Sequence, residues 1–281
     1  MDYDSAVLER VSQMFRSEMW RCVVPDAVAE ARIESARFGP VQATAYGDMP
    51  QVGALNQIQG AAEPGAVDGG YLAQAVEWMR AREVDYRVPV AEGRPGSAEA
   101  QGWLRERRYE PGDTWIKLVR DTSAPFPPED PGVEIFELGE EEADGEGLSS
   151  ILAEVFDMPV ALAALVFSLP MEDHWRCYTA AARPEEEIVA AASMLIHEGV
   201  AQLGPGGTLA HARNRGCNRA LIRRRLIDAA EAGCHTAFVE LGERDPELVL
   251  VAYTNLLRVG FKEAYRSRNW QRPALRPAAV R

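Results

Sequence analysis

The stretch Thr208-Leu209-Ala210-His211-Ala212-Arg213-Asn214-Arg215-Gly216-Cys217-Asn218-Arg219-Ala220-Leu221-Ile222 decides the fold of this chain. It leads from a predicted strand, through a short turn rich in arginine and glycine, into a predicted helix with an apolar stripe. The first turn of such a helix presents unpaired backbone N–H groups and the positive end of the helix dipole. From His211 to Arg225 there are six arginines and no acidic residue, although the whole chain carries a formal charge of −13. The stretch therefore predicts a site for a pyrophosphate group, with a solvated basic helix face as the alternative.

Two motifs in this part of the chain resemble one protein family. The spacing Arg213-X-X-Gly216-X-Asn218 resembles the acetyl-CoA loop of the GNAT superfamily of N-acetyltransferases, which is written Arg/Gln-X-X-Gly-X-Gly/Ala. Asn218 departs from that motif, but asparagine is a good helix N-cap. About forty residues on, Ala252-Tyr253-Thr254-Asn255-Leu256-Leu257-Arg258-Val259-Gly260-Phe261 resembles the family's closing Ala-X-X-Leu-Tyr-X-X-X-Gly-Phe. The tyrosine that many members use as general acid falls at Leu256, which has no proton to donate.

The resemblance implies a fold, a co-substrate and a set of binding residues. The implied fold is α+β, a tandem GNAT fold of two mixed β-sheets, each flanked by helices. The implied co-substrate is acetyl-CoA or another acyl-CoA, with no metal. The residues implied to bind it are Gly207, Thr208, Leu209, Arg213, Asn214, Arg215, Gly216, Cys217, Asn218, Arg219 and Asn255.

A proline-rich stretch from Asp121 to Gly132 divides the chain into two halves. It holds four prolines in twelve residues and cannot continue a helix or a sheet, so it predicts an extended linker. We therefore expect a GNAT-like N-terminal domain over 1–121, a linker over 122–132 and an acyl-CoA-binding GNAT domain over 133–281. After the linker, the sequence predicts strands at 133–138, 175–182, 188–197, 200–209, 236–241 and 261–270, and helices at 141–156, 159–169, 218–232 and 246–258.

The first half repeats this pattern imperfectly, which indicates an internal duplication. The expected elements are helices at 5–21, 69–82 and 97–108, and strands at 30–37, 41–47, 55–59, 85–90 and 114–120. In this copy the loop Ala61–Gly70 contains two carboxylates, Glu63 and Asp68, and no arginine. Carboxylates at a helix start repel an anion. We therefore expect a degenerate copy that binds no CoA and serves a structural role or forms one wall of the substrate cleft.

Composition restricts the class of protein and its partners. A chain of 281 residues that is 47% hydrophobic and 26% charged is typical of a soluble globular protein with room for two domains. Without a bilayer-spanning apolar run or a basic N-terminus, it is expected to be cytoplasmic, with no membrane partner. The four cysteines lack metal-ligand spacing and are expected to be reduced thiols. The net acidity argues against nucleic acid and favours a neutral or cationic small substrate. The partner that the resemblance implies is a small-molecule amine, and a homodimer is left open.

The resemblance implies transfer of an acetyl group from acetyl-CoA to a primary amine by direct attack in a ternary complex. Glu240, at the end of a predicted apolar strand, is the candidate general base, and a surface acid is the alternative. Desolvation by bound acyl-CoA is expected to raise the pKa of Glu240, which suits it to take a proton from an ammonium group. Tyr253 is the candidate acid in place of Leu256, and a core tyrosine is the alternative. Two other functions stay open: a non-catalytic CoA-binding regulatory protein, and an interaction module in which neither copy binds CoA.

Overall fold

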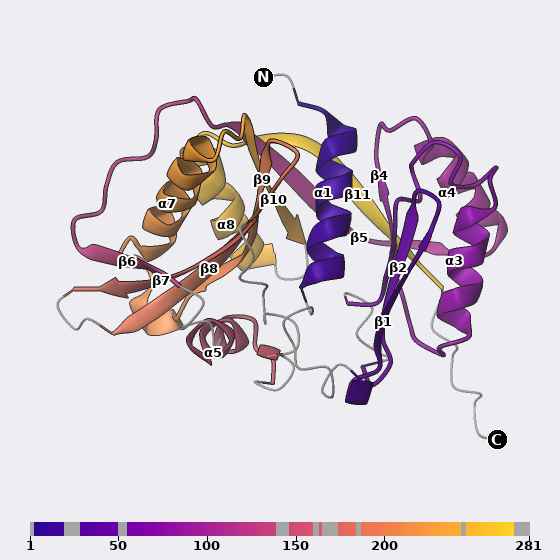
Figure 1. The fold of residues 1–281 in the computed structure, drawn as a ribbon, viewed down its shortest axis with the longest axis horizontal. Helices are drawn as coiled ribbons and strands as arrows, with labels where there is room; N and C mark the ends of the chain where they lie inside the picture. The colour runs from indigo at the N-terminus through magenta and orange to yellow at the C-terminus, as the bar shows by residue number, and fades with distance from the viewer. Residues whose placement is uncertain are drawn as a thin grey trace. The chain divides into compact units, whose positions relative to one another are not determined.

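The structure is a computed structural model that describes residues 3–19, 29–49, 55–138, 146–159, 163–164, 174–183, 187–242 and 246–272 (Figure 1). The chain forms two compact units. Unit 1 comprises Met1–Val28, Lys117–Leu241 and Asp245–Ala264, and unit 2 comprises Ala29–Ile116, Gly242–Arg244 and Tyr265–Arg281. These units differ from a division at the linker, because the long strands β5 (Glu110–Asp121) and β11 (Lys262–Gln271) each contribute residues to both.

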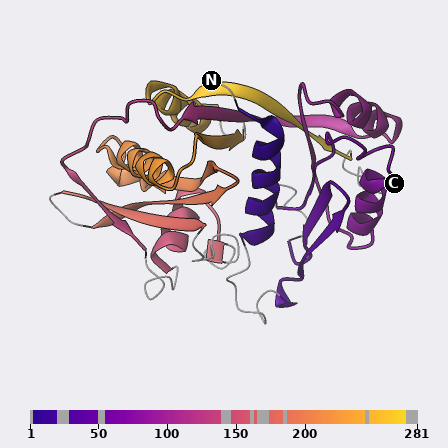
Figure 2. The ribbon, with the colours of Figure 1, turned by 45° about the horizontal axis from the view of Figure 1, so that its top comes forward.

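Unit 1 is a mixed sheet with helices on both faces. Its strands lie in the order β6-β7-β8-β9-β10-β5; β6 to β9 pair antiparallel with one another, and β9 pairs parallel with β10. Helix α7 contacts strands β6 to β9, while α5 packs on the opposite face of β7 to β9 (Figures 1 and 2). The elements are α1 (Ser5–Glu18), β6 (Val133–Glu137), α5 (Glu146–Val155), β7 (Trp175–Ala182), β8 (Ile188–His197), β9 (Val200–Thr208), the 3-10 turn η1 (Ala210–Ala212), α7 (Cys217–Glu231), β10 (Thr236–Gly242) and α8 (Pro246–Arg258).

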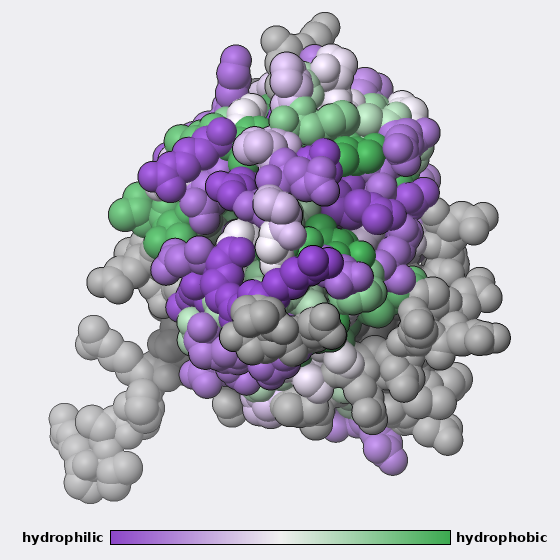
Figure 3. Space-filling model, turned by 90° about the vertical axis from the view of Figure 1, so that its left-hand side faces the viewer, coloured by the Kyte–Doolittle hydropathy of each residue, from purple (hydrophilic) through white to green (hydrophobic). Residues whose placement is uncertain are grey.

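Helix α1 belongs to this unit and packs on β9. Its apolar side chains Leu8, Val11 and Phe15 are buried, as the helical spacing of the sequence requires. The Asp4 side chain caps the helix by accepting a hydrogen bond from the Ala6 N–H at 2.8 Å. The side of the molecule shown in Figure 3 is mostly hydrophilic, with separate apolar patches.

Unit 2 repeats the plan of unit 1 on a smaller scale. Strands β1, β2 and β3 form an antiparallel sheet, and β4 pairs with the end of β11. A single parallel bridge, Gln57–Arg87, links β3 to the start of β4. Leu72 and Met79 of α3, Leu104 of α4 and Ile58 of β3 meet in one core. The elements are β1 (Ile33–Phe38), β2 (Val41–Tyr46), β3 (Gln57–Gln59), α3 (Tyr71–Arg80), β4 (Val88–Ala91) and α4 (Ser97–Glu106).

The element boundaries follow the sequence prediction closely. The predicted ranges 175–182, 188–197 and 246–258 coincide with β7, β8 and α8. Helix α7 begins one residue earlier than predicted, at Cys217. The predicted helix 159–169 lies mostly outside the described residues.

Candidate functional site

Strands β9 and β10 separate in the middle of the sheet of unit 1. Their parallel pairing covers only three residue pairs, which end at Gln202 and Phe238. Beyond that point β9 stays paired with β8 as far as the pair Thr208–Ala190, with a bulge between the pairs Ala192–Gly206 and Met194–Leu203. The backbone of β9 beyond Gln202 therefore leaves β10 and opens a gap in the sheet.

A buried arginine holds the bulge together. Arg225 of α7 is 3% exposed and donates to the backbone oxygen of Ser193 at 3.0 Å and to that of Gly204 at 3.5 Å. Burial lowers the pKa of Arg225 to about 10. This arginine of the basic stretch therefore stabilises the strands and is not free to meet an anion.

The gap leads into the loop that starts α7. Asn214 has φ +65° and Gly216, the residue before the helix, has φ +91°. Glycine adopts this left-handed conformation without steric cost, which explains its place in the motif. The Arg213 side chain is exposed and has no hydrogen bond or ion pair within the described chain. Arg215 instead donates to the backbone oxygen of Arg183 at 2.6 Å.

A carboxylate from the linker lies at the start of α7. Arg219 Nε donates to Asp130 Oδ2 at 2.8 Å, and Arg219 Nη2 bonds to the other oxygen. A Cβ atom added to Gly216 would lie 2.9 Å from Asp130 Oδ1. Sequence reasoning missed this residue, and its only signal was an acid in the linker just before β6.

The rest of the basic stretch is also partly neutralised. Arg224 bonds to Asp228 at 2.8 Å and to Glu137 at 2.8 Å. Arg223 donates to the backbone oxygen of Pro127 at 3.0 Å. The local positive charge expected from the sequence is thus reduced by acids that come from elsewhere in the chain.

The other predicted binding residues lie along β9 and the first turn of α7. Gly207 is packed so closely under α5 that an added Cβ would lie 2.3 Å from Val155 Cγ1. Leu209 is buried, while Thr208 and Asn218 are half-buried. Cys217 is buried, and burial raises the pKa of its thiol, so it is a packing residue rather than a nucleophile.

Glu240 lies in a cluster of charged groups under α1. Its Oε1 is 3.0 Å from Lys117 Nζ and accepts a hydrogen bond from Ser12 Oγ at 3.2 Å. Lys117 is 3% exposed in its side chain and also bonds to Glu9 Oε1 at 2.7 Å. Arg16 Nη2 lies 3.8 Å from Glu240 Oε2.

These contacts set the charge of Glu240. Burial alone raises its pKa, but Lys117 and Arg16 outweigh burial, and the pKa of Glu240 is lowered. A base for an ammonium group was expected to have a raised pKa, and the protein without ligand shows the opposite shift. Glu240 is therefore ionised at neutral pH and tied to neighbouring cations.

Helix α8 carries the other residues predicted for the site. The Tyr253 hydroxyl donates to Glu263 Oε2 at 3.2 Å, on strand β11. Leu256, at the position of the family's tyrosine, is buried at 5% exposure. Asn255 is half-buried, and its backbone oxygen accepts the Val259 N–H at 3.1 Å.

Comparison with known proteins gives a match at the level of fold. No family model matches the chain, and no curated protein matches its sequence. Among solved structures, the chain is similar to a GCN5-related N-acetyltransferase from Kribbella flavida, at a TM-score of 0.61 and 17% identity, covering 89% of this chain and 96% of that one. It is also similar to a GCN5-related N-acetyltransferase from Sphaerobacter thermophilus, at a TM-score of 0.58 and 15% identity, covering 83% and 81%.

A third match includes two copies in one chain. It is a tandem GNAT protein from the clavulanic acid biosynthesis pathway, at a TM-score of 0.57 and 13% identity, covering 93% of this chain and 94% of that one. The present chain has the tandem GNAT fold. The gap between β9 and β10 and the loop before α7 are the places where the GNAT resemblance puts acetyl-CoA.

The two GNAT-like copies start the corresponding helix in the same way but differ in charge. Gly70 precedes α3 with φ +70°, as Gly216 precedes α7. In the loop of unit 2, Arg94 bonds to Glu63 at 2.6 Å, and both side chains are largely buried. An arginine is present near this loop after all, but its charge is already paired with Glu63.

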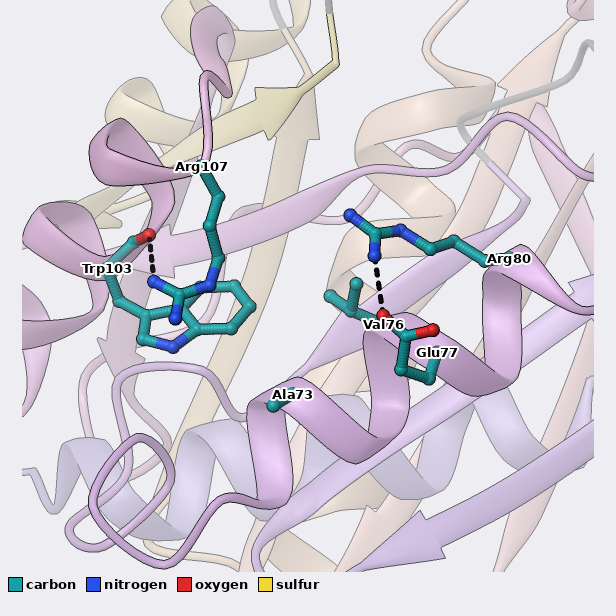
Figure 4. A pocket seen from close by; sticks show the side chains of 6 residues that line it. All are labelled: Ala73, Val76, Glu77, Arg80, Trp103 and Arg107. Atoms are coloured by element: carbon teal, nitrogen blue, oxygen red, sulfur yellow. Dashed lines mark hydrogen bonds and ion pairs between the residues drawn. The ribbon is translucent and has the colours of Figure 1, made fainter.

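Unit 2 also contains a small hollow between α3 and α4 (Figure 4). Its volume is about 170 Å³, and it is lined by Ala73, Val76, Glu77, Arg80, Trp103 and Arg107. The Arg107 guanidinium stacks 4.0 Å from the Trp103 ring centre, and Arg80 pairs with Glu77. No residue predicted to bind CoA lines this hollow. Within the described ranges, no helix is long and apolar enough to cross a membrane.

Proposed function

We propose that the chain is an acyl-CoA-dependent N-acyltransferase that moves an acetyl group from acetyl-CoA to a primary amine of a small molecule. The observation that carries the proposal is the combination in unit 1 of a strand gap at Gln202 with a left-handed glycine at the start of α7. The gap offers backbone groups of β9, and the helix start offers N–H groups to an anion. In unit 2 the arginine beside the loop, Arg94, is paired with Glu63, and this unit is proposed to bind no CoA.

The polar side-chain atoms along β8 and β9 fit a polar ligand. Three buried side-chain oxygens, Ser193 Oγ, Gln202 Oε1 and Thr208 Oγ1, have no hydrogen-bond partner within the described residues. A buried acceptor without a partner costs free energy, which a ligand N–H would recover. In this proposal β9 holds the pantetheine arm, while Arg213 and the first turn of α7 hold the phosphates.

The reaction itself needs mainly positioning. Bound acetyl-CoA would supply the acyl group. The ammonium first loses one proton to solvent or a base; the neutral amine then forms a bond to the acyl carbon, the carbon–sulfur bond breaks, and a second proton from the nitrogen reaches the departing thiolate. Glu240, with its lowered pKa, is a weak base at neutral pH. We therefore propose that Glu240 attracts the ammonium form of the acceptor, and that Tyr253 hydrogen-bonds the departing sulfur.

A non-catalytic CoA-binding protein is the second candidate, and one observation favours it. Leu256 is buried where the family carries its acid, and Tyr253 is already bonded to Glu263. Release of free thiol from acetyl-CoA, measured with a panel of primary amines, distinguishes the candidates. The proposed enzyme releases thiol only when an amine is present, whereas a regulatory protein binds acetyl-CoA without turnover.

A further inference from the structure

The linker between the two copies is fastened along helix α7. At its start, Thr122 Oγ1 donates to the backbone oxygen of Cys234 at 2.5 Å. Further on, Arg223 donates to the backbone oxygen of Pro127 at 3.0 Å. At its end, Asp130 bonds to Arg219 through both carboxylate oxygens. The linker therefore follows the helix back to its first turn.

Asp130 is placed where the proposed function puts a phosphate. Its carboxylate touches Gly216, since an added Cβ would lie 2.9 Å from Oδ1 and 3.0 Å from Cγ. The side chain is only 12% exposed, although Arg219 is 51% exposed. A negative charge at a helix N-terminus is stabilised by the helix dipole and, here, by a guanidinium group as well.

A carboxylate and a phosphate have the same requirements at this position. Both are anions that bind a helix N-terminus and take paired hydrogen bonds from arginine. If both were present, two negative charges would compete for Arg219 and for the space over Gly216. One of them must leave.

We propose that Asp130 is an internal latch: its carboxylate occupies the anion position at the start of α7 and is displaced when the pyrophosphate of an acyl-CoA binds. The latch rests on the proposed function, because it regulates the same site. Binding of CoA must first break the Asp130–Arg219 ion pair, which costs free energy. CoA therefore binds more weakly than it would to the same loop without Asp130. Removal of the carboxylate frees Arg219 for the ligand.

Calorimetric titration of CoA into the full chain and into Asp130→Asn tests the latch. Asparagine keeps the size of the side chain but removes its charge, and CoA affinity is expected to rise about five- to thirtyfold. Glu129→Gln is the matched control, because Glu129 is an exposed neighbour with no hydrogen bond or ion pair in the described chain. Pantetheine, which lacks the pyrophosphate, is expected to bind equally to all three proteins.

The outcomes separate the latch from the proposed function. Equal or weaker CoA binding by Asp130→Asn, with binding intact in the parent chain, overturns the latch alone. An equal gain in Glu129→Gln shows a general effect of charge and also overturns it. If neither the parent chain nor Asp130→Asn binds CoA, both the proposed function and the latch are overturned.

Discussion

Replacement of Lys117 by methionine probes the charged cluster around Glu240. The Lys117 side chain is 3% exposed, and its ammonium group lies within 3.0 Å of oxygen atoms of Glu9, Ser12 and Glu240. Methionine fills similar space but leaves two carboxylates, each 17% exposed, without their shared cation. Breaking a buried ion pair costs about 3–5 kcal/mol. Because Arg16 remains near Glu240, we expect the free energy of unfolding to fall by about 2–4 kcal/mol at pH 7.

The pH dependence follows from the direction of the pKa shift. The pKa of Glu240 is lowered below 4.5 in the folded chain, so its stabilising contribution is complete above pH 4.5 and is lost as the pH falls through the folded pKa. In Lys117→Met, burial without the ammonium raises the pKa of Glu240. Protonation then relieves the buried charge, so the destabilisation is expected to be smaller at pH 5 than at pH 7.

Urea unfolding of the parent chain and of Lys117→Met at pH 7 and pH 5 measures both effects. The matched control is Lys262→Met, since Lys262 is the only other lysine and is exposed. Its effect is expected to stay within about 0.5 kcal/mol. Equal stability of Lys117→Met and the parent, or a cost that does not change with pH, refutes the assignment of the cluster.

Three further changes test other parts of the site. Arg213→Gln should weaken CoA binding by about 1–2 kcal/mol in calorimetry, because the exposed guanidinium is proposed to contact only phosphate. Pantetheine binding should not change. An equal loss for both ligands would show that Arg213 shapes the loop and does not bind phosphate. Tyr253→Phe should slow acetyl transfer about 100-fold with little change in acetyl-CoA affinity, and an unchanged rate rules Tyr253 out as the acid. Gly207→Ala should lower the free energy of unfolding by about 1–3 kcal/mol, because the added methyl group clashes with Val155. Val155→Ala in the same chain should restore part of that loss. Purely additive losses would show that positions 207 and 155 are not in contact.

Local patterns were enough to predict most of the fold. Alternation and helical spacing predicted the ranges of β7, β8 and α8, and the arginine–glycine turn predicted the start of α7 to within one residue. These signals are local, since a strand or helix shows its buried face in its own sequence. The duplication was also visible, because both copies carry strand, glycine turn and helix in the same order.

The side-chain environment of the site could not be predicted in the same way. Asp130 and Arg219 are 89 residues apart, and Ser12 and Glu240 are 228 residues apart. No sequence periodicity links partners that are so far apart in the chain. The sequence alone therefore contains no sign that acids pair with the arginines of the basic stretch, or that cations surround Glu240. The raised pKa expected for Glu240 depended on an apolar strand end, whereas Lys117 on β5 and helix α1 surround it with charge.

Titration of acetyl-CoA into the full chain tests the central claim most directly. The proposed acyl-CoA site lies in unit 1, at the gap beyond Gln202 and the start of α7. Arg213→Gln is the matched variant, because it removes one exposed charge from the loop before α7. We expect one acetyl-CoA per chain, with weaker binding in Arg213→Gln. A stoichiometry of two, or no binding at all, would contradict it.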